Sequence, residues 1–226
     1  MKVLAIDTST WTASVALVDE HGAVIVEGEA RTETHSENLL PLIASLCKDP
    51  RALDAVAVGV GPGSFTGLRI GLSTAKGIAF AAGCPLWAAS SLAALALDLE
   101  IDGLRVPVLD ARRGEIFAGF YRDGVAIVPE RVMPPSALAG ALADVRNTDE
   151  TIALAGDALA VYPELAAIPS VITPPSRATP SAAAVARLAL RGDRADILGH
   201  GAPVYIRLSE AEVKYPDGVP GAIRKR

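Results

Sequence analysis

The sequence predicts an α/β protein in which one structural unit occurs twice, in residues 1–102 and again, less completely, in residues 103–226. Two observations carry this prediction. The elements expected before Ile101-Asp102-Gly103 follow the order strand, strand, strand, helix, strand, helix, and the same order begins again after it. The first strand of each half also ends on an aspartate, Asp7 and Asp110. A period of about 100 residues indicates a duplicated domain and not a short solenoid repeat.

In the first half, short apolar or alternating runs between turn residues predict strands. The expected strands are 3–6, 13–19, 23–29, 55–60 and 86–89, and the expected helices are 36–48, 66–82 and 91–99. The run at 55–60 is apolar throughout, as is typical of a parallel strand buried on both faces. Proline is tolerated in the first turn of a helix but not beyond it, so Pro41 predicts that the first helix begins near Asn38.

The second half repeats this pattern with fewer elements. The expected strands are 106–109, 115–121, 125–132 and 152–155, and the expected helices are 136–143 and 181–190. The turn Arg122-Asp123-Gly124 predicts a hairpin between the second and third of these strands.

Composition and charge exclude several classes of protein. Half of the residues (50%) are hydrophobic, so disorder is not expected, and only 4% are aromatic, so the core must consist of small aliphatic side chains. The net charge of −5 gives no overall basic field, so we expect poor binding of nucleic acid by the chain alone. The basic tail Arg224-Lys225-Arg226 is expected to be a solvated end.

The chain carries no sequence sign of export or membrane insertion. Cys47 and Cys84 lie far apart and outside any metal-ligand spacing, which indicates buried thiols in a reducing compartment. Asp7 interrupts the N-terminus before a signal-peptide core could form, and no run of about 18 apolar residues is free of charges and turn signals. A soluble cytoplasmic protein without membrane association is therefore expected.

The most informative segment is the glycine-rich run from Gly59 to Gly71. The run does not match the motif of a Walker phosphate loop, because no lysine follows Gly67. A dinucleotide fingerprint is disfavoured because the run follows a fourth strand and because Pro62 removes a backbone donor. Two interpretations remain: a tight turn that caps a helix, and a helix against which something packs very closely.

The helix after this run has a stripe of small residues. They recur at every fourth position and are Gly67, Gly71, Ala75, Ala79 and Gly83. Glycine inside a helix costs about 1 kcal/mol relative to alanine, so the stripe indicates close packing. The packing partner is either the protein's own sheet or a helix of another chain.

The preceding helix favours another chain, because its apolar arc is wider than a helix covering one sheet requires. Residues of both helices are therefore expected at a partner interface. They are Leu39, Leu42, Ile43, Leu46, Gly67, Arg69, Gly71 and Ala75.

A nucleotide site is also a candidate. In two-domain proteins that bind nucleotides between such domains, a loop like Asp7-Thr8-Ser9 receives phosphate and a glycine at the position of Gly156 supports the base. A second glycine is expected near Gly156, but Ala158 stands there. We therefore expect Asp7, Thr8, Ser9 and Gly156 to be a vestigial nucleotide site, with a plain Asx turn as the alternative for the loop.

Catalytic and metal-binding residues are not expected. The three histidines have no spacing that would form a helical metal pair, and no nucleophile elbow Gly-x-Ser-x-Gly occurs.

Five segments together resemble the TsaB (YeaZ) family, which partners TsaD in making threonylcarbamoyladenosine in tRNA. They are Leu4–Ser9, His35–Pro41, Gly61–Gly71, Asp110–Glu115 and Tyr205–Glu212, in the order of the family's signatures. The run Gly-Pro-Gly-Ser-Phe-Thr-Gly is the most specific of them. The resemblance covers essentially the whole chain.

The resemblance implies a duplicated RNase-H-like fold of the actin, Hsp70 and sugar-kinase type. It implies a non-catalytic adaptor that binds and activates TsaD, with the ATPase TsaE as a further partner and a homodimer when alone. TsaD carries a His-x3-His metal pair that this chain lacks, so its metal site cannot be transferred. No cofactor is expected for this chain, with ATP or ADP only in the complex and tRNA only through it. The alternative is an ATP-binding enzyme of the same fold.

Overall fold

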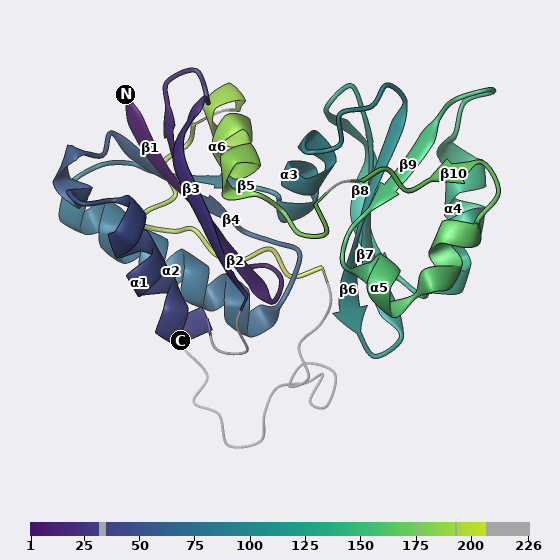
Figure 1. Cartoon of the computed structure of the whole chain (residues 1–226), viewed down its shortest axis with the longest axis horizontal. Helices are drawn as coiled ribbons and strands as arrows, with labels where there is room; N and C mark the ends of the chain where they lie inside the picture. The colour runs from purple at the N-terminus through teal and green to yellow at the C-terminus, as the bar shows by residue number, and fades with distance from the viewer. Residues whose placement is uncertain (32–34, 176, 193, 207–226) are drawn as a thin grey trace, which may run out of the picture.

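The computed structural model describes residues 1–31, 35–175, 177–192 and 194–206 of the chain. Two five-stranded mixed sheets lie side by side, and each forms the centre of a lobe (Figure 1). The first sheet has the order β3-β2-β1-β4-β5 and the second the order β10-β9-β6-β7-β8. The C-terminal part of the Tyr205–Glu212 signature and the basic tail lie outside the described residues.

The first lobe contains the elements of the first half of the chain. Its strands are β1 (Lys2–Asp7), β2 (Thr12–Asp19), β3 (Val24–Arg31), β4 (Ala55–Gly59) and β5 (Leu86–Ala89), and its helices are α1 (His35–Leu46), α2 (Phe65–Ala82) and α3 (Ser91–Leu97). β1 pairs antiparallel with β2 and parallel with β4. All five residues of β4 are buried, which confirms the expectation of a parallel strand covered on both faces.

The second lobe repeats this topology. Its strands are β6 (Leu104–Arg112), β7 (Glu115–Arg122), β8 (Val125–Met133), β9 (Ile152–Ala155) and β10 (Val171–Ile172), and its helices are α4 (Leu138–Val145) and α5 (Ala158–Val161). β6 pairs antiparallel with β7 and parallel with β9, as β1 does with β2 and β4. The duplicated RNase-H-like fold expected from the sequence is confirmed. The short elements α5 and β10 had no signal in the sequence.

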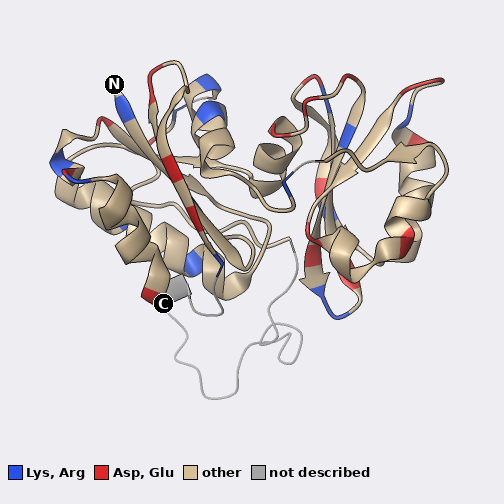
Figure 2. Ribbon diagram, viewed as in Figure 1, with Lys and Arg blue, Asp and Glu red and all other residues tan. Residues whose placement is uncertain are grey.

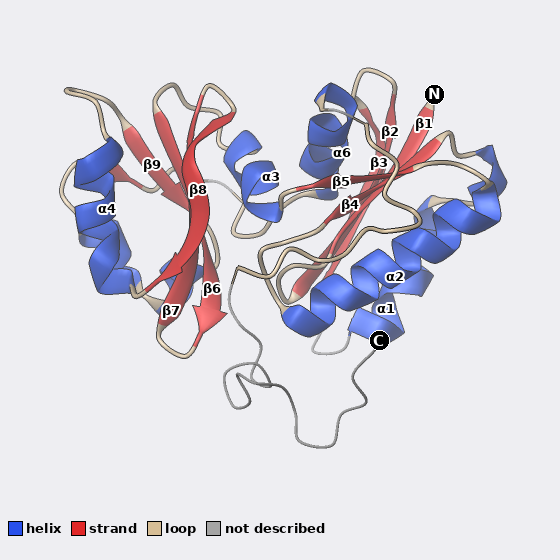
Figure 3. Ribbon diagram, turned by 180° about the vertical axis from the view of Figure 1, so that it is seen from behind, coloured by secondary structure: helices blue, strands red, loops and turns tan. Residues whose placement is uncertain are grey.

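Successive side chains of each strand point to opposite faces of the first sheet, so they pack into two separate cores. Leu4 and Ile6 of β1 point into the core under α1 and α2, whereas Val3 and Ala5 point to the opposite face. That opposite face is rich in alanine, so a helix can approach it closely. Figure 3 shows α1 and α2 on one side of the sheet and α6 (Ala182–Arg191) on the other.

Helix α6 differs from the sequence-based interpretation, which included it in the second half. It packs on the first sheet, where Ala182 and Ala186 join the cluster of Val3 and Ala5. The Ala182 N–H donates to Ser14 Oγ at 2.9 Å, which fixes the start of the helix on β2. Because both surfaces are rich in alanine, they can approach each other closely, and the chain returns to the first lobe.

The start of α1 also differs from the prediction. The helix begins at His35 and not near Asn38, so Pro41 lies in its second turn. Proline removes the hydrogen bond to the carbonyl of the residue four positions earlier. Glu37 and Pro41 are both exposed, so water can replace that bond and the helix tolerates the proline.

Helix α3 lies between the lobes. Its Leu92 and Leu95 are fully buried in a cluster with Leu109, Phe117 and Tyr121 of the second sheet. Lys and Arg residues and Asp and Glu residues are scattered over both lobes (Figure 2). Among the described residues, no helix is both long and apolar enough to cross a bilayer.

Candidate functional site

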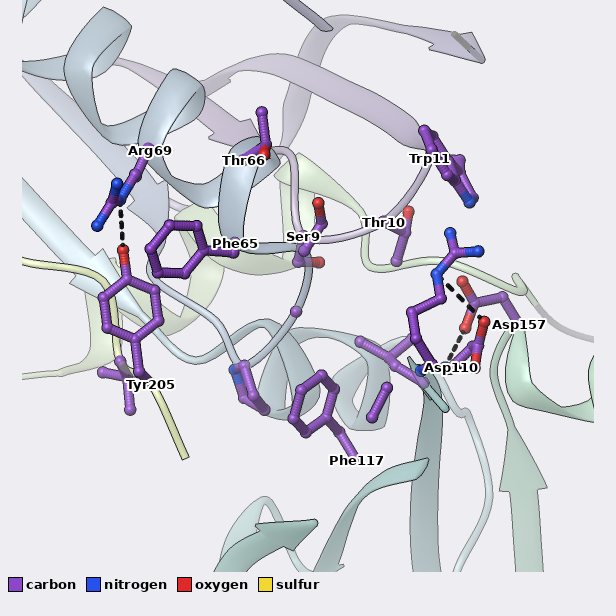
Figure 4. A pocket seen from close by; sticks show the side chains of 17 residues that line it. Ser9, Thr10, Trp11, Phe65, Thr66, Arg69, Asp110, Phe117, Asp157 and Tyr205 are labelled. Carbon is purple, nitrogen blue, oxygen red and sulfur yellow. Dashed lines mark hydrogen bonds and ion pairs between the residues drawn. The ribbon is translucent and has the colours of Figure 1, made fainter. Parts of the chain in front are cut away.

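A cavity of about 710 Å³ lies between the two lobes. The first lobe lines it with the turn after β1 and the start of α2, and the second lobe with the end of β6 and the loop after β9. Its labelled side chains in Figure 4 are Ser9, Thr10, Trp11, Phe65, Thr66, Arg69, Asp110, Phe117, Asp157 and Tyr205. This volume lies in the range of small-molecule sites.

The loop Asp7-Thr8-Ser9 folds inward, below the cavity. The Asp7 side chain accepts hydrogen bonds from Ser9 N and Ser9 Oγ at 2.9 and 2.6 Å and from Ser91 Oγ at 2.7 Å. The Thr8 hydroxyl donates to the Gly67 carbonyl at 2.8 Å. Both side chains are buried, with exposed fractions of 1% for Asp7 and 0% for Thr8.

The start of α2 closes over this loop. A Cβ on Gly63 would lie 2.4 Å from the Ser9 carbonyl oxygen, and one on Gly67 would lie 2.1 Å from the Thr8 carbonyl oxygen. A Cβ on Gly71 would lie 2.2 Å from Thr8 Oγ1. Gly63 and Gly67 are required because backbone meets backbone there, and Gly71 because the helix meets the Thr8 side chain. The loop therefore has little room for a phosphate group.

Glycine is required at position 156 for a separate steric reason. Its φ of +141° and the 1.8 Å between an added Cβ and the Val108 carbonyl oxygen exclude a side chain. Ala158 is buried at 0% exposure in the core of the second lobe. Of the four residues expected to bind a nucleotide, Ser9 lines the cavity, whereas Asp7, Thr8 and Gly156 are buried and do not.

Asp157 lines the cavity from the second lobe. Its Oδ1 accepts the Asp110 N–H at 2.9 Å. Burial raises the pKa of Asp157 to about 6, and the nearby Asp110 carboxylate adds to the rise. Asp110 itself is held by Arg112, whose Nε lies 3.4 Å from Asp110 Oδ2.

Replacing Asp157 by asparagine should change how stability depends on pH. A carboxyl whose folded pKa is raised from 3.8 to about 6 contributes stability below its unfolded pKa and loses it as the pH rises through about 6. Asp157→Asn should therefore unfold at a higher urea concentration than the wild type at neutral pH, and the difference should shrink toward a pH of about 4. A difference of equal size at both pH values would contradict the assignment.

Two aromatic–arginine contacts flank the cavity. On one side, the Arg112 guanidinium lies 4.7 Å from the centre of the Trp11 ring, across the gap between the lobes. A bulge between Asp110 and Arg112 in β6, with Arg112 at a φ of 65°, turns this side chain toward Trp11. On the other side, Arg69 lies 3.7 Å from the centre of the Phe65 ring, and its Nε donates to Tyr205 Oη at 3.0 Å.

Most residues expected at a partner interface are buried or half-buried within the protein. Leu39 and Ile43 are buried in the first core at 1% and 4% exposure. Leu42 and Leu46 are half-buried, and they pack on Gly28 of β3 with methyl groups 3.0 and 3.4 Å from the position of a Cβ there.

The stripe of small residues on α2 also faces inward. Gly67 and Gly71 pack on Thr8, and Ala75 is buried in the core at 0% exposure. Gly67 and Gly71 are thus packed against the protein's own first loop and Ala75 within the first core, which is the internal packing that the sequence left open as the alternative. Only Arg69 of the eight expected residues is exposed.

A different stripe of α2 faces solvent. It consists of Arg69, Ser73, Gly77, Phe80 and Ala81, and we call it the outer stripe. Phe80 is 80% exposed, and a Cβ on Gly77 would meet no described atom within 4 Å. Leu40, on the neighbouring helix α1, is 57% exposed. Phe80 and Leu40 are thus large exposed apolar side chains on the two helices that cover one face of the first sheet (Figure 3).

Several residues at the cavity were not placed at a site by the sequence. Trp11 and Phe117 lie in none of the five family segments and Tyr205 begins one of them, but only the fold brings the three together. Ser90 and Ser91, which hold carboxylates at the start of α3, could have been recognised as a capping pair before an alanine and leucine run.

Comparisons with known proteins find the threonylcarbamoyltransferase TsaD as a family model and TsaB (YeaZ) proteins among the most similar relatives. A family model for tRNA N6-adenosine threonylcarbamoyltransferase (TsaD) matches residues 18–214. The tRNA threonylcarbamoyladenosine biosynthesis protein TsaB of Bacillus subtilis is 33% identical over 95% of this chain and 98% of its own length. YeaZ from Pseudomonas aeruginosa has the same fold with a TM-score of 0.74 at 30% identity, covering 90% of this chain and 99% of that one.

A more distant structure shares the fold alone. It is the activator of 2-hydroxyisocaproyl-CoA dehydratase from Clostridium difficile with bound ADPNP, with a TM-score of 0.53 at 8% identity. The alignment covers 84% of this chain and 95% of the activator.

Proposed function

The chain belongs to the TsaB (YeaZ) family of tRNA threonylcarbamoyladenosine biosynthesis proteins, and on this basis we propose that it is the non-catalytic adaptor of a TsaD-type enzyme. In this role it binds and activates the threonylcarbamoyltransferase that modifies adenosine next to the anticodon of tRNA. Family membership supports a part in threonylcarbamoyladenosine synthesis, and the match to the TsaD family model indicates that adaptor and enzyme share an origin.

The buried state of Asp7 is the observation that best supports a non-catalytic role. A carboxylate that binds a metal or a phosphate-bound water must face a cavity. Asp7 instead accepts hydrogen bonds from Ser9 and Ser91 and is 1% exposed. An inactive paralogue of TsaD would have such a loop, because selection no longer keeps it open for ligand.

The outer stripe supports a binding role. We propose that Ser73, Gly77 and Phe80 meet a helix of the TsaD-type subunit, with Phe80 as the buried anchor of the interface. The same surface would join two copies of the chain when the partner is absent. A TsaE-type ATPase would complete the assembly in the cytoplasm, and tRNA would be held by the complex, because this chain has a net charge of −5.

The alternative function is an enzyme of the same fold that binds ATP by itself. The fold relative with bound ADPNP and the open cavity favour it. Titration calorimetry of the isolated chain with ATP and Mg²⁺ separates the two proposals. We expect no saturable binding, because Asp7 and Thr8 are already hydrogen-bonded inside the chain. Stoichiometric binding that Asp7→Ala abolishes would instead favour the ATP-binding alternative.

A further inference from the structure

Two adjacent serines at the start of α3 hold carboxylates that belong to opposite lobes. Ser91 Oγ donates to Asp7 Oδ2 at 2.7 Å, at the end of β1 in the first lobe. Ser90 Oγ donates to Glu130 Oε1 on β8 in the second lobe. The hydroxyl of Tyr121 on β7 donates to the same oxygen of Glu130.

The hydroxyl groups of Ser90 and Tyr121 both act as hydrogen-bond donors to Glu130. Ser90 Oγ accepts the Ala93 N–H at 3.1 Å as the cap of α3, so its single proton is the one given to Glu130. Tyr121 is 3% exposed, and burial together with the Glu130 carboxylate raises its pKa, so it stays a hydrogen-bond donor. A change in the angle between the lobes would separate Ser90 from Glu130.

Packing around α3 supports the same connection. The helix belongs to the first lobe by chain order, yet Leu92 and Leu95 are buried against Leu109 and Phe117 of the second sheet. The start of α3 is therefore the point where hydrogen bonds and apolar contacts from both lobes meet.

We infer that Ser90 and Ser91, with Asp7 and Glu130, form an interlobe joint that fixes the angle between the lobes. The joint makes the molecule a single rigid body, with the cavity held at constant width. This inference does not depend on the proposed partner, because it concerns the isolated chain. A protein that is already rigid loses less conformational freedom when it binds, so the joint would preorganise the chain for any partner.

The variant Ser90→Asp breaks the joint without removing the helix cap. Aspartate is a good cap and can still accept the Ala93 N–H, but its charge repels Glu130. The double variant Ser90→Asp with Glu130→Gln is the rescue, because the glutamine amide can donate to the carboxylate introduced at position 90 and still accept from Tyr121. Ser45→Asp, an exposed serine on α1, is the matched control for the added charge.

The readout is the distribution of distances between two spin labels, at His21→Cys in the first lobe and Val125→Cys in the second, in the full chain. Both positions are exposed, and the native thiols Cys47 and Cys84 are buried at 6% and 8% exposure, which favours labelling at the new sites. We expect a narrow distribution in the parent and the control. Ser90→Asp should broaden it about twofold or more, and the double variant should restore it.

Two results would overturn the inference. In one, Ser90→Asp gives the same distribution as the parent, so that apolar packing alone sets the angle. In the other, Ser90→Asp broadens the distribution and the double variant does not narrow it, so that the damage is not the loss of the bond to Glu130. If Ser90→Asp does not fold, Ser90→Ala is measured instead, and an unchanged distribution in that variant would equally reject the joint.

Discussion

Replacing Gly71 with leucine is expected to destabilise the folded chain by about 3 kcal/mol or more, although leucine is the better helix former. A Cβ at this position would lie 2.2 Å from Thr8 Oγ1, closer than non-bonded atoms approach. Thr8 cannot move aside easily, because it is 0% exposed and its hydroxyl donates to the Gly67 carbonyl. Urea denaturation, followed by circular dichroism, measures the change in the free energy of unfolding.

A second glycine of the same helix provides the control. Gly77 is exposed and a Cβ there would meet no described atom within 4 Å, so Gly77→Leu should raise stability by up to about 1 kcal/mol through helix propensity. The same substitution is therefore expected to change the free energy of unfolding in opposite directions at the two positions. If Gly71→Leu unfolded at the same urea concentration as Gly77→Leu, the packing of α2 on Thr8 would be wrong.

The same Gly77→Leu variant is expected to weaken binding of the TsaD-type subunit by about 100- to 1,000-fold, equivalent to about 3–4 kcal/mol. A leucine side chain on the outer stripe would stand where Ser73 and Gly77 allow a partner helix to approach closely. Because the monomer stays folded, the loss reports on the interface and not on stability. Isothermal titration of the partner subunit into each variant measures it.

Gly140 of α4 is a matched control in the second lobe. It is also an exposed helical glycine whose Cβ would meet no described atom within 4 Å, so Gly140→Leu should bind the partner as the wild type does. Phe80→Ser tests the other half of the outer stripe and should cost about 2 kcal/mol of binding or more. Normal binding by both Gly77→Leu and Phe80→Ser would move the interface away from α2.

The strands and the duplication could be predicted because their signals are local. The strands expected at 86–89 and 152–155 match β5 and β9. The alternation of large and small residues in β1 can be read from the sequence. Which helix packs on the face with the small residues cannot. Nothing near Ala182 indicates that α6 packs on Val3 and Ala5, since that choice depends on the fit between two alanine-rich surfaces far apart in the chain.

The candidate site was only partly predictable for a related reason. The stripe of Gly67 and Gly71 indicates close packing, and close packing is present, but periodicity cannot tell which surface fills it. The protein's own Thr8 does so. Trp11 and Asp157 line one cavity only because the two lobes face each other, and their separation along the chain left no pattern to find.

Reconstitution of threonylcarbamoyl transfer to tRNA tests the adaptor role most directly. The purified chain, a TsaD-type subunit with a TsaE-type ATPase, and the mixture of all three would be compared with the same tRNA, ATP and threonylcarbamoyl donor. We expect no transfer by the chain alone, because its Asp7 loop is closed, and a strong gain when it is added to the other subunits, because of the proposed contact between its outer stripe and the enzyme. Transfer by the chain alone at the rate of the mixture would contradict a non-catalytic adaptor.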